Sequence, residues 1–266
     1  MSQAKTTAGR WALITGASGG IGYELCRLFA LDGFNVVLVS RNAEQLANVA
    51  RELEHLYSSK SFVLPKDMSD PAAAGEIHAE VRKQGISIDI LVNNAGFGDL
   101  GSFAMEAWEV QRQMLQVNIT GLVQLTRLFL PEMIKHRQGR ILNISSTAAF
   151  SPVPYMAVYA AAKAFVLSFT QALSAELEGT GITATALCPG VTSTGFARRA
   201  KTEHTWLVRL NRMNAADVAR IGYRALMKGR ARVVPGWFNK LLTGSIRFSH
   251  PALLLKVSKI LMRPAT

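Results

Sequence analysis

Cysteine is scarce in this chain of 266 residues, which contains Cys26 and Cys188 and no other. The two residues lie far apart and have neither CxxC nor Cys/His spacing, so the sequence indicates no disulfide framework and no metal site. Long apolar runs are also missing. The stretch ALLLKVSKILM is interrupted by Lys256 and Lys259 and is too short to cross a bilayer. Because no secretory leader pattern precedes the first apolar run, we expect a protein of the reducing cytoplasm.

Acidic residues are rare in the last quarter of the sequence. From Arg198 to Thr266, 15 Lys and Arg residues face only Glu203 and Asp217, a net charge of +13, whereas residues 1–197 have 15 basic and 16 acidic residues. This contrast favours a neutral scaffold that ends in a basic surface. Such a surface can bind nucleic acid, an anionic membrane or an acidic partner. No nucleic-acid-binding motif accompanies the charge, so we do not expect nucleic acid as the partner.

Short apolar runs rich in β-branched residues alternate with longer helical patterns, which is typical of repeated βαβ units. One helix is predicted over residues 42–57, capped by Asn42, and another from Asp70 to Gly85. The seven predicted strands cover residues 11–15, 35–40, 61–65, 88–94, 139–145, 183–188 and 231–235. No linker divides the chain. We therefore predict an α/β fold: a single-domain, Rossmann-like, doubly wound parallel sheet with helices on both faces and ligands at the carboxyl ends of its strands.

A glycine-rich turn, TGASGGIG, joins the first predicted strand to a helical pattern at residues 15–22. Gly16 permits a tight turn, while Gly20 and Gly22 let the backbone and the helix approach a pyrophosphate at the helix amino end. A glycine pattern alone also fits a plain structural turn. Its position directly after the first strand favours dinucleotide binding.

The end of the second predicted strand carries Ser40 and Arg41 where NAD-binding proteins usually have an acidic residue. An acidic side chain would repel a 2′-phosphate, whereas Ser40 can donate a hydrogen bond to it and Arg41 can form an ion pair with it. The pattern predicts NADPH rather than NADH as the cofactor. The alternative is that Arg41 is a solvated residue at the start of a helix.

Tyr159 and Lys163 are four residues apart in a strongly helical stretch, so their side chains share one helix face. Lowering a phenol pKa from about 10 to about 7 requires roughly 4 kcal/mol. A positive charge about 4 Å away at an effective dielectric constant near 20 supplies that amount. Lys163 could therefore make Tyr159 an acid or base near neutral pH. The alternative is a core tyrosine beside a solvated lysine.

Ser145 and Ser146 follow a predicted strand, where a hydroxyl could hold a substrate oxygen.

Taken together, these motifs resemble the short-chain dehydrogenase/reductase family over about residues 10–235. Further matching features are Asp67 after the third strand, NNAG at residues 93–96, Asn118 in VNITG and CPGVTST at residues 188–194. The family places its catalytic serine 13 residues before the tyrosine, which selects Ser146 over Ser145. Tyr155 is excluded as the catalytic tyrosine, because no lysine stands four residues after it.

The resemblance implies a role for each matching residue. Asn118 would bend a helix and hold a water that links Lys163 to solvent, and Lys163 would also bind the nicotinamide ribose. Asp67 would contact the adenine, residues 94–96 the adenine ribose side, and residues 189–194 the nicotinamide. The expected catalytic residues are Asn118, Ser146, Tyr159 and Lys163. The expected cofactor-binding residues are Gly16, Ser18, Gly19, Gly20, Ile21, Gly22, Ser40, Arg41, Asp67, Met68, Asn94, Ala95, Gly96, Tyr159, Lys163, Pro189, Gly190, Val191, Thr192 and Thr194.

By this resemblance, NADPH delivers a hydride to a carbonyl carbon, Ser146 positions the carbonyl oxygen and Tyr159 protonates it; the reverse reaction uses the same groups. The substrate would be an apolar or acyl-linked ketone. Two alternatives remain open: a 3-ketoacyl thioester reductase whose basic surface engages an acidic carrier, and an NADPH-binding sensor or scaffold whose basic tail binds a membrane or a partner.

The sequence divides into an expected catalytic domain, residues 1–236, and a basic extension, residues 237–266. Within the domain, the resemblance implies a substrate lid over residues 195–214, in which Phe196, Trp206, Leu207 and Leu210 could line an apolar pocket. The alternative is that this segment is a solvated helix face. In the extension, Leu253, Leu254, Val257, Ile260 and Leu261 share one face of a predicted amphipathic helix. That helix could pack on the domain or on a second subunit, or attach the cytoplasmic protein to a membrane surface. The resemblance implies a homodimer or homotetramer formed through the helices that carry Asn118 and Tyr159.

Overall fold

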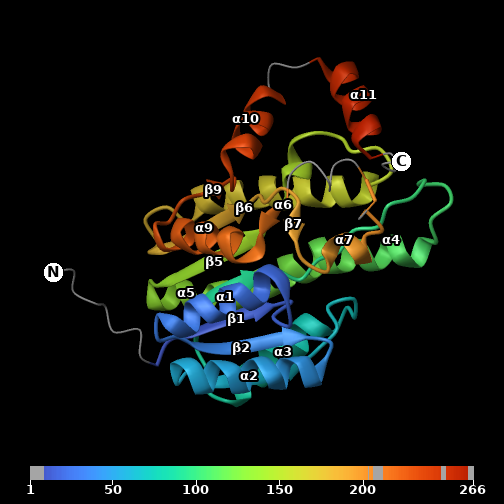
Figure 1. Ribbon diagram of the computed structural model, residues 1–266. Helices are drawn as coiled ribbons and strands as arrows, with labels where there is room; N and C mark the ends of the chain where they lie inside the picture. The colour runs from blue at the N-terminus through green and yellow to red at the C-terminus, as the bar shows by residue number, and fades with distance from the viewer. Residues whose placement is uncertain (1–8, 203, 206–211, 247–249, 263–266) are drawn as a thin grey trace.

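The computed structural model describes residues 9–202, 204–205, 212–246 and 250–262. In the first half of the chain, strands and helices alternate regularly (Figure 1). The first half runs β1 (Trp11–Thr15), α1 (Gly20–Leu31), β2 (Asn35–Ser40), α2 (Ala43–Tyr57), β3 (Ser61–Pro65), α3 (Ala73–Lys83), β4 (Ile88–Asn93), α4 (Trp108–Leu115), the π-helical turn η1 (Gln116–Thr120) and α5 (Gly121–His136).

The second half is less regular. It runs β5 (Gly139–Ile144), the short 3₁₀ turn η2 (Thr147–Phe150), α6 (Ala157–Glu176), β6 (Ile182–Leu187), β7 (Thr192–Ser193), α7 (Phe196–Arg199), β8 (Met213–Asn214), α9 (Ala215–Met227), β9 (Arg232–Val233), α10 (Trp237–Ser245) and α11 (Pro251–Leu261). None of the helices in the described ranges is both long and apolar enough to span a bilayer.

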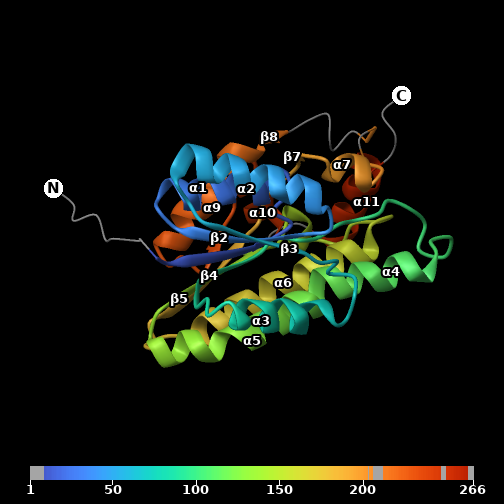
Figure 2. The same cartoon turned by 90° about the horizontal axis from the view of Figure 1, so that it is seen from below.

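A seven-stranded parallel sheet of order β3-β2-β1-β4-β5-β6-β9 forms the centre of the molecule. The chain winds outward from β1 to β3 and then, from β4, in the opposite direction, so the strand order reverses between β1 and β4. The crossover helices α1, α2 and α9 cover one face, and α3, α4, α5 and α6 cover the other (Figure 2). This arrangement confirms the predicted Rossmann-like fold, whose ligands bind where the strand order reverses.

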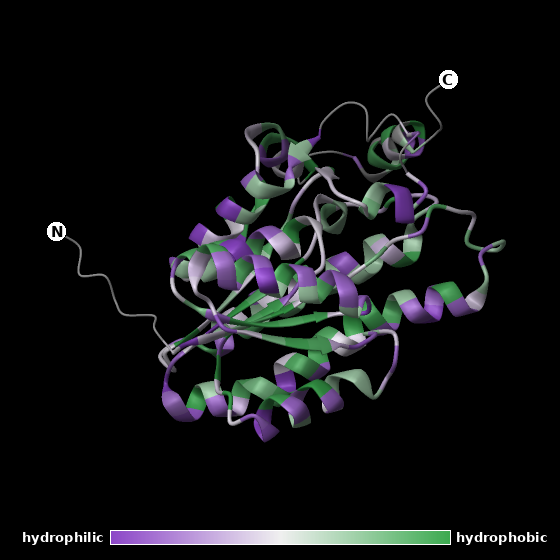
Figure 3. Cartoon of the chain, turned by 60° about the horizontal axis from the view of Figure 1, so that its bottom comes forward, coloured by the Kyte–Doolittle hydropathy of each residue, from purple (hydrophilic) through white to green (hydrophobic). Residues whose placement is uncertain are grey.

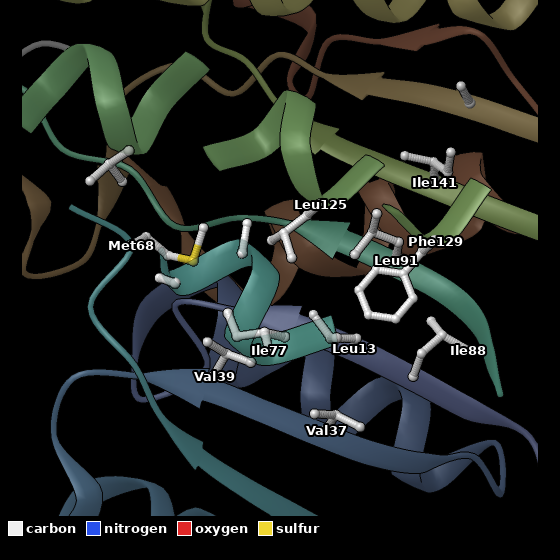
Figure 4. Packing of buried hydrophobic residues seen from close by; sticks show 14 of the residues in the cluster. Leu13, Val37, Val39, Met68, Ile77, Ile88, Leu91, Leu125, Phe129 and Ile141 are labelled. Carbon is white, nitrogen blue, oxygen red and sulfur yellow. The ribbon is translucent and has the colours of Figure 1, made fainter. Parts of the chain in front are cut away.

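Alternate residues of each central strand enter the cores on the two faces of the sheet. In β1, Leu13 packs towards α3 and α5, whereas Ala12 and Ile14 pack towards α1 and α2. Figure 4 shows part of the first core, in which Ile77 of α3 and Phe129 of α5 meet the strands. In Figure 3 the strands are accordingly hydrophobic, between helices with polar outer faces. Burial on both faces is why these strands read as continuous apolar runs.

Two details differ from the sequence predictions. Helix α3 begins at Ala73 rather than at Asp70, because residues 67–72 form a turn in which the Asp70 carboxylate accepts a hydrogen bond from the Ala72 amide. In addition, β7 and β8 form a separate two-stranded parallel pair that was not predicted. Each of these strands has two residues, too few to show an alternating pattern. The predicted cap at Asn42 is confirmed, since its side chain accepts from the Gln45 amide.

Candidate active site

The carboxyl end of β1 leads into the glycine turn. Gly16 and Gly20 have φ angles of +68° and +55°, a left-handed conformation that glycine adopts without strain. A Cβ at Gly22 would lie 2.2 Å from the carbonyl oxygen of Gly16, so the turn and helix α1 can pack this closely only without a side chain. Gly19 makes no side-chain cap, and the first turn of α1 has no acidic residue. The amino end of α1 therefore suits the pyrophosphate of a dinucleotide.

A polar clasp holds this turn against the end of β4. The Asn94 amide group donates to the carbonyl oxygens of Thr15 at 2.9 Å and Gly16 at 3.2 Å. The buried Thr15 hydroxyl accepts from the backbone amides of Asn94 and Ala95. The side chain of Asn94 is thus engaged with the turn itself, and sequence reasoning missed Thr15. A threonine that ends a strand gives no pattern of its own in a single sequence.

The groups expected near the adenosine lie together at the end of β2 and after β3. The hydroxyls of Ser18 and Ser40 are 2.8 Å apart, and the Arg41 guanidinium is 3.8 Å from the Asp67 carboxylate, both groups being exposed. Met68 is placed differently from expectation. Its side chain is buried in the hydrophobic core beside α3, which leaves its backbone as the part that could face a cofactor (Figure 4).

The π-helical turn η1 interrupts the helix between α4 and α5 at Asn118. The Asn118 side chain is buried, accepts from the Phe97 amide at 3.1 Å and donates to the Phe97 carbonyl oxygen at 2.8 Å. A Cβ on Gly96 would lie 2.7 Å from the Asn118 side-chain oxygen and 3.2 Å from Lys163 Nζ. These values place Asn118, Gly96 and Lys163 next to one another.

Ser146, Tyr159 and Lys163 converge from the end of β5 and the first two turns of α6. Tyr159 is hydrogen-bonded to Ser146, and Lys163 Nζ lies 5.7 Å from the centroid of the Tyr159 ring. Lys163 Nζ donates to the Ile144 carbonyl oxygen at 3.0 Å. The hydroxyl of the neighbouring Ser145 is buried and donates to the Lys163 carbonyl oxygen at 2.8 Å. The structure thus brings Ser146, and not Ser145, to the tyrosine.

The pKa shifts in this cluster differ from the sequence expectation. Burial raises the pKa of Tyr159 to about 12, although its hydrogen bond with Ser146 acts in the opposite direction. Burial also lowers the pKa of Lys163 to about 8. The expected fall of the tyrosine pKa to about 7 is therefore wrong for the protein alone. The loss of hydration of the phenolate outweighs the attraction of the ammonium, which is held at Ile144 rather than at the phenol oxygen.

The loop of residues 189–194 bridges the glycine turn and the base of the lid. A Cβ on Gly20 would lie 2.9 Å from the methyl group of Thr194. The Thr192 hydroxyl donates to the Gly190 carbonyl oxygen, and the Val191 carbonyl oxygen accepts from the Met213 amide. Pro189 accepts from the Thr147 amide through its carbonyl oxygen. The loop is thereby fixed at the carboxyl end of β6, beside Ser146.

The first part of the segment expected to be a lid lies against the tyrosine. Phe196 of α7 lies 5.4 Å from Tyr159, between ring centroids. Lys201 forms an ion pair with the buried Asp99 carboxylate at 3.0 Å. The guanidinium of Arg199 lies 4.2 Å from the Phe97 ring centroid. Burial, and secondarily the charge of Arg41, lowers the pKa of Arg199, which sequence reasoning did not assign. The predicted lid residues Trp206, Leu207 and Leu210 lie outside the described residues.

A small cavity of about 30 Å³ opens beside the tyrosine, lined by Asp99, Glu106 and Met156 among others. A larger hollow of about 510 Å³ lies between α3 and α5, near the amino end of β4 and therefore at the opposite edge of the sheet. No group of three or more His, Cys, Asp or Glu residues in the described ranges could hold a metal ion.

The extension does not pack as its apolar pattern predicts. In α11, Met262, just beyond the helix, is buried in the core that contains Tyr159, whereas Val257 and Ile260 are 46% and 56% exposed. Leu254 is half-buried. The helix meets the domain along the row of residues 254, 258 and 262, at one edge of the predicted apolar face. Leu253 and Leu261, also assigned to that face, are not among the side chains that the structure describes.

Comparison with known proteins agrees with this geometry. Residues 10–205 match the family model described as short chain dehydrogenase. The chain is 38% identical over 192 residues to mouse 17-beta-hydroxysteroid dehydrogenase type 3, covering 71% of this chain and 62% of the relative. It is 35% identical over 199 residues to very-long-chain 3-oxoacyl-CoA reductase-A of Danio rerio, covering 73% and 61%. The chain thus spans about three fifths of the length of these relatives.

Among solved structures, a short-chain dehydrogenase from Sphingobium yanoikuyae in complex with NADPH superimposes with a TM-score of 0.82 at 29% identity, covering 92% of this chain and 95% of that one. A 7beta-hydroxysteroid dehydrogenase gives a TM-score of 0.86 at 25% identity, covering 97% and 100%. The matched segment contains the glycine turn, Asn118, Ser146, Tyr159 and Lys163 in one order and in one site. The chain therefore belongs to the short-chain dehydrogenase family of oxidoreductases.

Proposed function

We propose that this protein is an NADPH-dependent reductase of ketones, with Tyr159 as the proton donor. The observation that carries this proposal is the convergence of Ser146, Tyr159 and Lys163 at the carboxyl ends of the strands, with Ser146 hydrogen-bonded to Tyr159. When bound, the nicotinamide supplies the hydride. The protein's own side chains must then hold the substrate oxygen and provide its proton.

Each side chain of the cluster has a distinct task in this proposal. Ser146 holds the carbonyl oxygen beside the Tyr159 hydroxyl, which keeps its proton at neutral pH because burial raises its pKa to about 12. As negative charge develops on the substrate oxygen, Tyr159 donates this proton. Lys163 stabilises the phenolate that results, because its ammonium is 5.7 Å from the ring centroid in a buried site. Asn118 fixes the Phe97 backbone and, with it, the wall next to Lys163.

NADPH, rather than NADH, is the proposed cofactor. Ser40 and Arg41 occupy the end of β2, and Arg199 of the lid adds a third polar group whose pKa responds to the charges of Arg41 and Asp67. Two cations near one position favour a 2′-phosphate over a hydroxyl. The Arg41 side chain is exposed and its ion pair with the Asp67 carboxylate is long, at 3.8 Å, so it can turn towards a phosphate.

The substrate that we propose is an apolar or acyl-linked ketone. The wall beyond Tyr159 is formed by Met156 and Phe196, since a Cβ on Gly98 would lie within 3.2 Å of both of these side chains and of Tyr159. A 3-ketoacyl thioester reductase is a specific second candidate. Its support is the basic lid, in which Arg198, Arg199 and Lys201 could bind a phosphate-containing carrier group, together with the likeness to the Danio rerio reductase.

We also propose that the enzyme is a cytoplasmic homodimer or homotetramer, assembled through the helices that carry Asn118 and Tyr159. Trp108 of α4 and Phe165 of α6 are 65% and 41% exposed on that side. Large exposed apolar side chains on neighbouring helices favour an interface between subunits.

Turnover of NADPH with a panel of ketones, aldehydes and 3-ketoacyl thioesters tests the proposal, with matched variants. Tyr159→Phe should lower kcat by at least about a thousandfold and change the Kd for NADPH by no more than about threefold. Ser146→Ala should lower kcat by tenfold or more. Ser145→Ala removes a buried hydroxyl that donates to the Lys163 carbonyl oxygen and also meets the Cys188 thiol, so it should instead affect mainly stability. Full turnover by Tyr159→Phe would refute the mechanism, and NADPH binding without turnover of any substrate by the wild type would favour a sensor.

A further inference from the structure

Helix α10 has its polar side turned inward and its apolar side turned outward. Asn239 and Thr243, one turn apart, are its buried residues. Asn239 donates to the Pro235 carbonyl oxygen at 2.9 Å, and the Thr243 hydroxyl donates to the Asn239 carbonyl oxygen. The side chains on the opposite face are Trp237, Phe238, Leu241 and Leu242, which are 77%, 47%, 64% and 42% exposed. This is the reverse of the usual amphipathic surface helix.

Helix α11 also exposes apolar side chains. Leu255, Val257 and Ile260 are 42%, 46% and 56% exposed, while the row that ends at the buried Met262 contacts the domain. Figure 1 shows α10 and α11 above the sheet, at the same end of the molecule. In Figure 3, the helix beside the C-terminus contains hydrophobic segments, which are drawn in green. These seven exposed side chains lie on two helices at the same end of the molecule, and we refer to them together as the patch. Monomeric proteins rarely expose many large apolar groups close together.

The charge around the patch has one sign. Lys240 of α10 and Lys256 and Lys259 of α11 are all exposed. No acidic residue follows Asp217 in the sequence, so nothing in this part of the chain offsets them. Aromatic and aliphatic side chains flanked by lysines match the interface of an anionic bilayer, where rings insert at headgroup depth and lysines reach the phosphates.

We propose that the outer faces of α10 and α11 form a docking surface for an anionic lipid bilayer. A second copy of the chain fits the surface less well. A symmetric contact between two such patches would bring like-charged lysines together without a carboxylate to pair with them, which is destabilising. A bilayer with acidic headgroups removes this repulsion and buries the same apolar area.

The docking helices also contact the catalytic half of the molecule. A Cβ on Gly190 would lie 2.7 Å from the Asn239 side chain, so α10 packs directly on the loop that follows β6. The Asn239 amide lies 3.5 Å from the sulfur of Met213, at the base of the lid. At the other arm, Met262 is buried in the core that contains Tyr159. A bilayer bound to α10 and α11 would therefore lie on the same side of the molecule as the lid, where an apolar substrate of the proposed reductase could enter from the membrane.

Vesicle flotation of the full-length chain tests the docking surface directly. The probes are vesicles of phosphatidylcholine alone and with about 30% phosphatidylglycerol, at about 150 mM salt. The first variant is Leu241→Gln/Ile260→Gln, and the second is Lys240→Gln/Lys256→Gln/Lys259→Gln. The matched control is Leu31→Gln/Leu56→Gln, which changes two equally exposed leucines (63% and 53%) of α1 and α2. NADPH-dependent reduction of a water-soluble ketone is measured for each protein, so that failure of docking and failure of the proposed reductase are separate results.

We expect the wild type and the control to float with the anionic vesicles. Each test variant should bind them at least tenfold more weakly and keep its activity on the water-soluble ketone. Equal flotation of all four proteins, or no flotation of the wild type, would overturn the proposal. Equal flotation with neutral vesicles would overturn its electrostatic part. Light scattering tests the competing occupant, a second copy of the chain. If the wild type is a dimer that does not float, and Leu241→Gln/Ile260→Gln is a monomer, the patch is a contact between two copies.

Discussion

At the residue scale, the buried ammonium of Lys163 gives the proposed reaction a characteristic pH dependence. Burial lowers the pKa of Lys163 to about 8, so the charged form is present below that pH and is lost as the pH rises through it. We expect kcat/KM for ketone reduction to be flat from about pH 6 to 7.5 and to fall up to tenfold per unit above about 8. Stopped-flow NADPH oxidation across this range, with cofactor affinity determined at each pH, provides the measurement. A profile that is flat to pH 10 would contradict the assignment.

Gly96 gives a second prediction at this scale. A methyl group there would lie 2.7 Å from the Asn118 side-chain oxygen and 3.2 Å from Lys163 Nζ. Gly96→Ala should therefore displace both side chains, lower kcat by at least tenfold and cost about 1–3 kcal/mol of stability. The control is Gly75→Ala on α3, where nothing lies within 4 Å of an added methyl group. That change should stabilise the protein by about 0.5–1 kcal/mol. Urea unfolding and turnover measure both effects, and equal behaviour of the two variants would argue against the described packing.

The residues that converge in the candidate active site could be identified from the sequence, because their roles require fixed spacings along the chain. A tyrosine and a lysine four apart must share a helix face, and glycines that follow a first strand must turn. The prediction failed for properties that depend on how deeply a side chain is buried. The pKa of Tyr159 moved opposite to the expected direction, since no sequence pattern states how much water the phenol loses. It also missed Thr15, whose hydroxyl holds the backbone of Asn94 and Ala95 through contacts about 80 residues apart.

At the element scale, the ion pair between Lys201 and Asp99 fastens the first part of the lid to the loop after β4. The Asp99 carboxylate is 9% exposed, so Lys201→Gln leaves a buried charge without its cation. We expect a loss of about 1–2 kcal/mol and a several-fold rise in substrate KM with a smaller change in kcat. Lys228→Gln, at an exposed lysine after α9, should change neither. Adding Asp99→Asn to Lys201→Gln should restore the stability, and a double variant as unstable as the single one would exclude the ion pair as the cause.

Long, buried secondary-structure elements were easier to predict from the sequence than short or exposed ones. All seven strands of the main sheet were found, because each is an apolar run between turn signals. The start of α3 was misplaced by a turn that Asp70 caps. The orientation of α10 had no sequence signal, because Asn239 and Thr243 are buried through hydrogen bonds to the backbone, which hydrophobic periodicity does not register.

At the scale of the whole molecule, cofactor binding should raise the thermal stability of the entire sheet. NADPH at about 100 times its Kd contributes about 2.7 kcal/mol, which corresponds to roughly 5–10 °C in Tm for a chain of this size. NADH at the same concentration should give a smaller shift. Arg41→Asp should reverse this order, and Arg51→Asp, the same charge change in the second half of α2, should not. A thermal scan of the three proteins measures the effect. An unchanged preference in Arg41→Asp would remove Arg41 from the cofactor site.

The pairing of β7 with β8 has a consequence for the order in which ligands bind. Strand β7 continues the loop that would contact the nicotinamide, and its partner β8 ends the lid, so both ends of the lid are tied to the cofactor loop. If the cofactor fixes the conformation of residues 189–194, it also fixes the β7–β8 pair at the base of the lid, on which substrate affinity depends. We therefore expect an ordered sequential mechanism: NADPH enters first and NADP leaves last. Product inhibition by NADP should be competitive with NADPH and non-competitive with the ketone, and a random-order pattern would mean that the lid closes independently of its base.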